Sequence, residues 1–184
     1  HVAIDPDSEI ITNTAVTAAN QSDGSVARAL LEEILPAPPA EVDEPMLTPT
    51  KSGADPSIEA GDVITPRSDP VEVYGDASYG TGEILEYVEG RAVHYLKVQQ
   101  PSAPAGLFSK AAFEVDLENG TVRCPAGVLA QIRALPSGSS GEFGSHCATC
   151  RLRDQCTKSK SGRTIQIHPH ERQLQRERAR QKAP

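Results

Sequence analysis

An aspartate at the end of a β-prone run is the first residue in this sequence whose position suits catalysis. Val71–Tyr74 is β-prone and ends at Gly75-Asp76, and a helical pattern follows over residues 82–89. Thr81 is suited to cap that helix, and Gly90 is suited to end it. Ligands collect at the carboxyl edge of the strands in α/β sheets, so Asp76 is a candidate catalytic residue. The alternative is that Asp76 only bonds the backbone of its own turn.

Four cysteines form the second group of residues that could do chemistry. All lie in one stretch, at Cys124, Cys147, Cys150 and Cys156. Clustered cysteines in a protein without secretion signals favour a metal over disulfides, and a CxxC pair lets two thiolates reach one ion. The pattern therefore predicts Zn²⁺ held by these four residues. Free thiols and an iron–sulfur cluster remain alternatives, and His146 could replace one cysteine.

The elements that must position these residues follow from periodicity. Strands near residues 1–5, 10–17, 71–75 and 92–99 are expected to share one sheet, with helices near 24–35 and 82–89 packed on it. The first two strands are expected to form an antiparallel hairpin. Beyond residue 100 we expect a hairpin turn at 118–120, a glycine-serine loop at 137–144, a strand at 164–167 and a helix at 168–181. The region around the cysteines is expected to lack a core of its own.

Composition and charge point to an acidic body with a basic end. Residues 151–184 hold 10 of the 18 basic residues and 3 of the 25 acidic ones, whereas the whole 184-residue chain has a net charge of −7. Such a basic terminal segment is typical of nucleic-acid contact, although it could also be a solvated arm. The sequence shows no signal peptide or membrane-spanning stretch, which favours a cytoplasmic protein without membrane contact.

Several stretches together resemble one family. In order they are HVAIDPDSEIITNTAVTAANQSDG, VYGDASYGTGEIL, FEVDLENGTVRCPAG, CATCRLRDQC and HPHERQLQRERARQ. They are similar to the middle of bacterial insertion-sequence transposases of the DDE type, from the group with a cysteine-bearing insert. The similarity covers about residues 1–35 and 71–183.

The resemblance implies an RNase H-like α/β fold and phosphoryl transfer on DNA. Three carboxylates would hold two Mg²⁺ ions, and Asp76 matches the second acidic position. The family's Asp-x-Gly-Tyr reads Asp76-Ala77-Ser78-Tyr79 here, which departs from the pattern at Ser78. The first aspartate is expected before His1 and the glutamate beyond Pro184, so the segment should be inactive alone. Asp5, Glu171 and Glu177 are weaker candidates for the two missing carboxylates.

The expected organisation combines these pieces. Residues 1–35 form part of the core, 36–70 a Pro-rich acidic loop, 71–100 the unit that carries Asp76, 101–167 the cysteine-containing insert, and 168–184 a basic helix. Candidate DNA-binding residues are Arg151, Arg153, Lys158, Lys160 and Arg163. The expected partners are transposon-end DNA and further copies of the full-length protein. Two other functions compete: a zinc-stabilised nucleic-acid-binding module without catalysis, and a nuclease with an iron–sulfur clasp.

Overall fold

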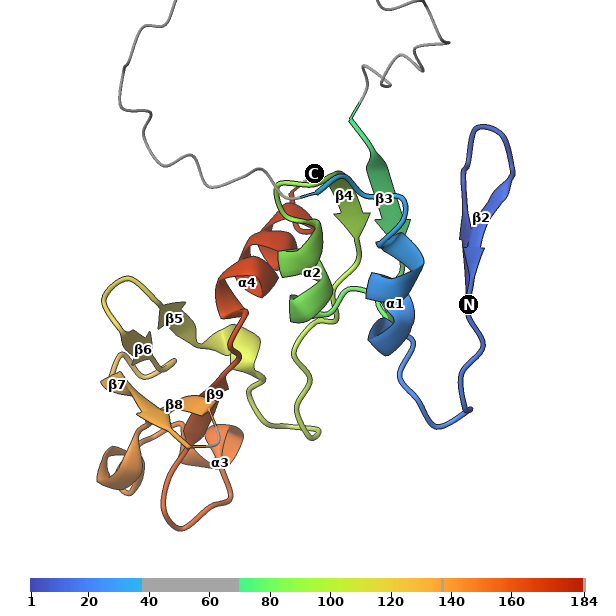
Figure 1. Ribbon diagram of the computed structural model, residues 1–184. Coiled ribbons are helices and arrows are strands. Elements are labelled where there is room, and N and C mark those ends of the chain that lie inside the picture. Colours follow the sequence, from blue (N-terminus) through green and yellow to red (C-terminus); the bar gives the residue numbers. More distant parts are fainter. Residues whose placement is uncertain (38–69, 137, 184) are drawn as a thin grey trace, which may run out of the picture.

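The computed structural model describes residues 1–37, 70–136 and 138–183 (Figure 1). The elements are β1 (Val2–Ile4), β2 (Ile11–Thr14), α1 (Gly24–Leu31), β3 (Glu72–Gly75), α2 (Gly82–Val88), β4 (Val93–Leu96), η1 (Lys110–Ala112), β5 (Glu114–Asp116), β6 (Thr121–Arg123), β7 (Leu129–Leu135), β8 (Gly138–Glu142), η2 (Gly144–Cys147), α3 (Arg153–Cys156), β9 (Thr164–Ile167) and α4 (Glu171–Arg180). The predicted Pro-rich loop lies almost entirely outside the described residues. None of the helices described is long and apolar enough to cross a membrane.

The first structural unit is a parallel β3–β4 pair covered on one face by helices. Val73 aligns with His94 and Gly75 with Leu96, and this face packs against α2, α1 and α4. The other face is exposed and carries Tyr74 and Tyr95, whose rings stack with centroids 4.7 Å apart. The core under the sheet is aliphatic and includes Leu85 and Val88, both fully buried. The prediction of an α/β architecture, with helices packed on a sheet, is confirmed.

The turn between β3 and α2 is defined by local signals. The Thr81 side chain accepts a hydrogen bond from the Ile84 N–H at 3.3 Å, as expected of an N-cap, and Gly90 ends the helix with a φ of 73°. Gly80 approaches β4 so closely that a Cβ there would lie 1.7 Å from the Lys97 carbonyl oxygen. Only glycine fits at that position, and it brings the Asp76 turn against the end of β4.

The N-terminal hairpin forms as predicted, but it does not join the β3–β4 sheet. β1 and β2 pair antiparallel and, within the described residues, make a separate two-stranded sheet. The prediction of one shared sheet is therefore wrong for this part of the chain. Side chains hold the hairpin instead: Asn13 donates to the Leu30 carbonyl at 3.4 Å, and the His1 ring bonds the Tyr79 hydroxyl at 3.1 Å. Strand propensity alone does not specify a partner strand, and here these side-chain contacts decide the placement.

The second structural unit is a five-stranded antiparallel sheet in the order β5-β6-β7-β8-β9. It has its own hydrophobic core, which contains Phe113, Val122, Phe143 and Ile165. The expectation that this region lacks a core is therefore wrong. The predicted glycine-serine loop is also wrong over residues 138–142, which form β8. A Cβ on Gly141 would lie 2.9 Å from Val122 Cγ2. The glycine in β8 therefore leaves room for this core side chain of β6.

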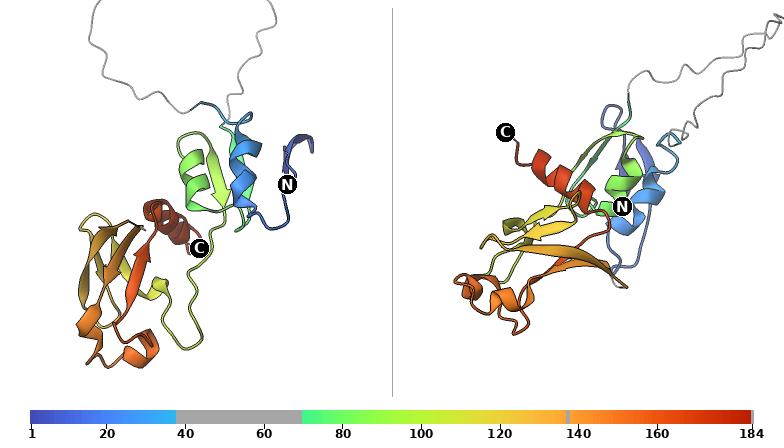
Figure 2. Two further views of the ribbon diagram at one scale, coloured as in Figure 1. Left: turned by 60° about the horizontal axis from the view of Figure 1, so that its bottom comes forward. Right: turned by 90° about the vertical axis from the view of Figure 1, so that its left-hand side faces the viewer.

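Helix α4 joins the two units. It follows β9 closely in the chain and packs along α2 of the first unit (Figure 2). The Gln175 side chain donates to the Val115 carbonyl of β5 at 3.0 Å, so the same helix also touches the small sheet. The predicted helix at 168–181 is thus confirmed as α4, and it lies between the two cores.

Candidate metal and nucleic-acid sites

Asp76 lies at the carboxyl edge of the β3–β4 pair, as predicted. Its side chain is exposed, and its Oδ1 accepts a hydrogen bond from the Ser78 N–H at 2.8 Å. Its carbonyl oxygen accepts from the N–H groups of Tyr79 and Gly80, both at 3.2 Å. Asp76 therefore orders its own turn and still presents a carboxylate to solvent at this edge. The turn interpretation of Asp76 is therefore confirmed, and its catalytic role stays a prediction.

A second acidic residue, Asp23, lies near this edge, immediately before α1. Its side chain makes no capping hydrogen bond to α1. Instead Asp23 Oδ1 lies 3.9 Å from His1 Nδ1, which also contacts Tyr79. Burial raises the pKa of the Tyr79 hydroxyl, and the negative charges of Asp23 and Asp76 raise that pKa further. The two carboxylates thus flank one tyrosine, which no local pattern could show.

The weaker acidic candidates occupy other environments. Asp5 stabilises the turn that follows it, because its Oδ2 accepts a hydrogen bond from the Ser8 hydroxyl at 2.7 Å. Glu171 and Glu177 are both only 2% exposed on α4 and face cations. Glu171 pairs with Lys110 and with Arg178, the latter at 3.5 Å. Within the described residues no three His, Cys, Asp or Glu side chains lie at the geometry of a metal site, so no complete two-ion carboxylate site is present there.

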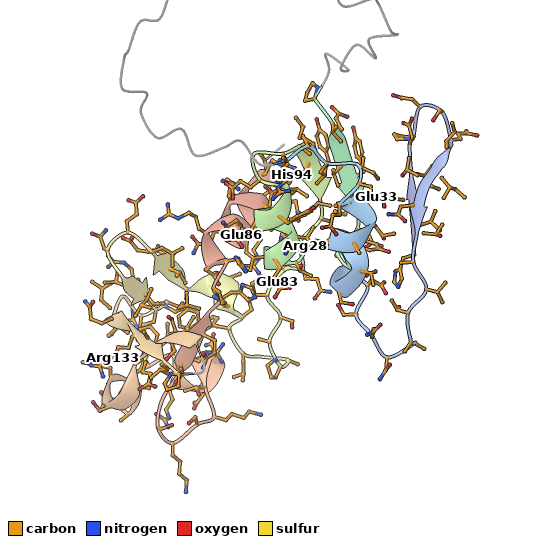
Figure 3. All side chains as sticks on the ribbon, viewed as in Figure 1. Arg28, Glu33, Glu83, Glu86, His94 and Arg133 are labelled. Carbon is orange, nitrogen blue, oxygen red and sulfur yellow. The ribbon has the colours of Figure 1, made fainter. Side chains whose placement is uncertain are left out.

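Glu177 pairs with a histidine from the β3–β4 unit. Its Oε1 lies 3.1 Å from Nε2 of His94, whose position on β4 is marked in Figure 3. Its Oε2 lies 3.3 Å from the Arg180 guanidinium. His94 therefore connects β4 with α4. Both glutamates hold α4 in place, which accounts for their burial.

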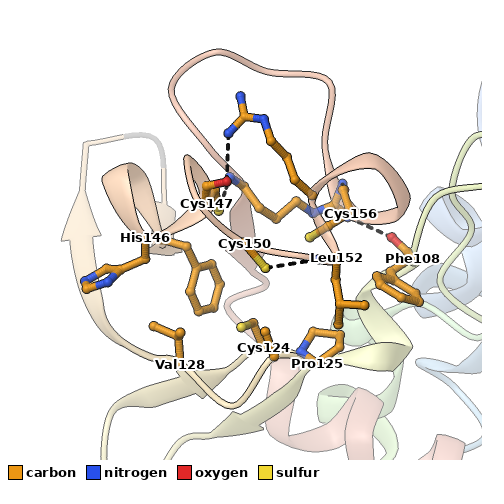
Figure 4. A pocket seen from close by; sticks show the side chains of 13 residues that line it. Phe108, Cys124, Pro125, Val128, His146, Cys147, Cys150, Leu152 and Cys156 are labelled. Carbon is orange, nitrogen blue, oxygen red and sulfur yellow. Dashed lines mark hydrogen bonds between the residues drawn. The ribbon is translucent and has the colours of Figure 1, made fainter.

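The four cysteines come from two stretches of the chain, one from the end of β6 and three from residues 144–156, and they line one cavity. Cys124 follows β6, Cys147 ends η2, Cys150 lies between η2 and α3, and Cys156 ends α3. All four are free thiols, and the cavity that they line measures about 20 Å³. Figure 4 shows their side chains directed into the same space. His146 also borders the cavity, but it is exposed and its ring points away from the four cysteines in Figure 4.

The cavity is mainly apolar, with a few polar contacts to sulfur. The Leu152 N–H donates to Cys150 Sγ, and the Arg163 N–H donates to Cys147 Sγ, both at 3.4 Å. Burial raises the pKa of the Cys156 thiol; the nearby cysteines raise that pKa further, while Arg163 opposes the shift. Burial outweighs Arg163, so the thiol form of Cys156 is favoured.

The predicted DNA-binding cations divide into two groups. Arg153 donates to the carbonyls of Cys147 and Ser159, each at 2.9 Å, and so ties the cysteine loops together. Arg163 is half-buried and donates to the Phe108 carbonyl at 3.2 Å. Loop carbonyls need donors when the loop packs on a core, and these two arginines supply them. The other three cations are exposed: Arg151, Lys158 and Lys160.

Comparison with known proteins gives one match. Residues 124–184 match the family model described as Transposase DDE domain. This is about one third of the chain, and it contains all four cysteines, the exposed cations and α4. No curated protein and no solved structure matches the chain.

Proposed function

We propose, from the match of residues 124–184 to the transposase DDE domain family, that this chain is a segment of the catalytic region of a DNA transposase. The family match confirms the resemblance to a DDE-type transposase and carries the proposal. Asp76 supports it from outside the matched residues, because an exposed carboxylate stands at the carboxyl edge of the β3–β4 pair. The proposal includes an RNase H-like arrangement of the complete domain, action in the cytoplasm and assembly of several copies on transposon ends.

In this proposal Asp76 is one ligand of Mg²⁺. Mg²⁺ prefers carboxylate oxygens and, when bound, would supply charge stabilisation for the attacking and leaving oxygens of a phosphodiester. The chain's own contribution is orientation: the Ser78 N–H fixes one oxygen of Asp76, and the close approach at Gly80 fixes the turn against β4. One carboxylate does not complete such a site. Glu171 and Glu177 do not supply the others, because each is already paired with cations inside the fold.

The competing functions differ in their requirement for Asp76. A nucleic-acid-binding module without catalysis would use the exposed cations and leave Asp76 as a turn residue. An iron–sulfur nuclease would depend on iron at the cysteines. The family match favours the transposase over both, since it names the DDE catalytic domain.

A cleavage assay tests the proposed function. The full-length parent protein should cut DNA that carries the ends of its element in Mg²⁺, and chelation of the metal should stop the reaction. The 184-residue segment alone should not cut. Binding of the same DNA by the parent without any Mg²⁺-dependent cleavage would overturn the catalytic proposal in favour of the binding module.

DNA contact by the exposed cations gives a separate prediction. Each phosphate contact contributes about 0.9 to the slope of log affinity against log salt, so replacing Arg151, Lys158 and Lys160 together with Ala should lower the slope by about 2.7. Sequence preference should not change, because phosphate contacts carry no base information. The measurement is the affinity for DNA of the parent protein over a range of salt concentrations.

The matched control is Arg133→Ala, which removes an exposed cation of β7 in the same small sheet (Figure 3). Its slope should stay that of the wild type. Arg153 and Arg163 are left in place because their loss would loosen the cysteine loops as well as remove charge. An unchanged slope in the triple variant would place the DNA on another surface.

A further inference from the structure

The cysteine cavity has the size of a site for one ion. A cavity needs about 10–15 Å³ to admit one water-sized particle, and this one measures about 20 Å³. Four sulfur-bearing side chains surround it, and two of them end short helical turns, η2 and α3. A multi-iron cluster needs far more room than one water-sized particle. The dimensions therefore favour a single metal ion over a cluster.

The walls of the cavity place hydrogen-bond donors and a cation beside the cysteines. Backbone N–H groups point at the sulfurs of Cys147 and Cys150. Arg163 also lines the cavity, and among the described residues its Nε is buried with no hydrogen-bond partner. The half-buried Arg163 therefore brings a positive charge to the cavity wall, which would offset part of the negative charge of thiolates bound to a metal.

We propose that Cys124, Cys147, Cys150 and Cys156 form a structural Zn²⁺ site that fastens the 144–156 segment to the end of β6. Four sulfur ligands at tetrahedral positions are a characteristic zinc set, and a set with four protein ligands leaves no open position for catalysis. The described residues hold no three such side chains already at ligand geometry, so zinc entry requires the four sulfurs to draw closer together, to about 2.3 Å from the ion.

Zinc binding converts four thiols into four thiolates and releases up to four protons, which leaves the site with a net charge of −2. Arg153 donates to the Cys147 carbonyl and Arg163 to the Cys156 carbonyl, so both lie close enough to offset this charge. Affinity must therefore rise with pH, because protons compete with the metal. Arg151 lies inside the 144–156 segment, and Lys158 and Lys160 follow it closely. The site would therefore also hold these three exposed cations in position.

Metal analysis of the purified 184-residue chain tests this inference. The protein produced with added zinc should hold about one zinc per chain, and titration with Co²⁺ should give the absorption of a tetrahedral thiolate site. Cys150→Ser should lower zinc affinity by more than tenfold. His146→Ala is the matched control, because His146 lines the same cavity, and it should keep the metal.

Three results would overturn the inference. They are four titratable thiols with no metal in the wild type, iron with visible absorbance, or loss of the metal in His146→Ala. The Co²⁺ spectrum of the wild type does not depend on any variant folding. None of these readouts uses DNA cleavage, so the zinc site and the transposase proposal stand or fall separately.

Discussion

Asp76→Asn in the full-length parent should reduce Mg²⁺-dependent DNA cleavage more than about 100-fold, since even the outer partners of metal ligands cost 10–100-fold when lost. The substitution removes one negative charge from the metal site and almost no volume. Asn keeps an oxygen at the position of Oδ1 and can still accept from the Ser78 N–H, so the turn should persist. DNA affinity and thermal stability should therefore stay close to those of the wild type.

The matched control is Asp7→Asn, which changes an exposed aspartate in the turn of the N-terminal hairpin. It should cleave at the wild-type rate. Single-turnover cleavage, measured beside DNA binding for both variants, separates loss of chemistry from loss of substrate. Wild-type cleavage by Asp76→Asn would reject Asp76 as a metal ligand and leave it as a turn residue.

Glu171→Ala should lower the free energy of unfolding by about 3 kcal/mol, the low end of the range for breaking a buried ion pair. Glu171 is 2% exposed, and it accepts from Lys110, Arg178 and the His168 N–H. Its loss leaves two cations and one backbone donor at the junction of α4 with the small sheet. The low end applies because Lys110 and Arg178 retain 22% and 20% exposure and can recover some hydration.

Urea unfolding of the 184-residue chain at neutral pH measures this effect. Glu142→Ala, at an exposed carboxylate on β8, should change stability by less than about 0.5 kcal/mol, as is usual for surface substitutions. Equal effects of the two variants would show that Glu171 does not hold the junction.

Local signals in the sequence determined the elements around Asp76 and much of the chain end. The cap at Thr81, the stop at Gly90 and the hairpin turn at Gly120 each depend on neighbours within a few residues, and all three appear as predicted. The strand β9 and helix α4 likewise follow from short runs of suitable residues. Asp76 could be placed at a strand end for the same reason.

Tertiary structure decided the features that depend on distant segments. β8 has too few large apolar residues to be recognised, because its small residues accommodate Val122 from β6. Arg153 and Arg163 turn inward because loops folded elsewhere leave carbonyls that need donors. The burial of Glu171 depends on Lys110, which lies 61 residues away in the chain. Cys124 and Cys147 line one cavity only after the small sheet has folded. A shared cavity results from packing between distant segments, so no pattern along the chain predicts it.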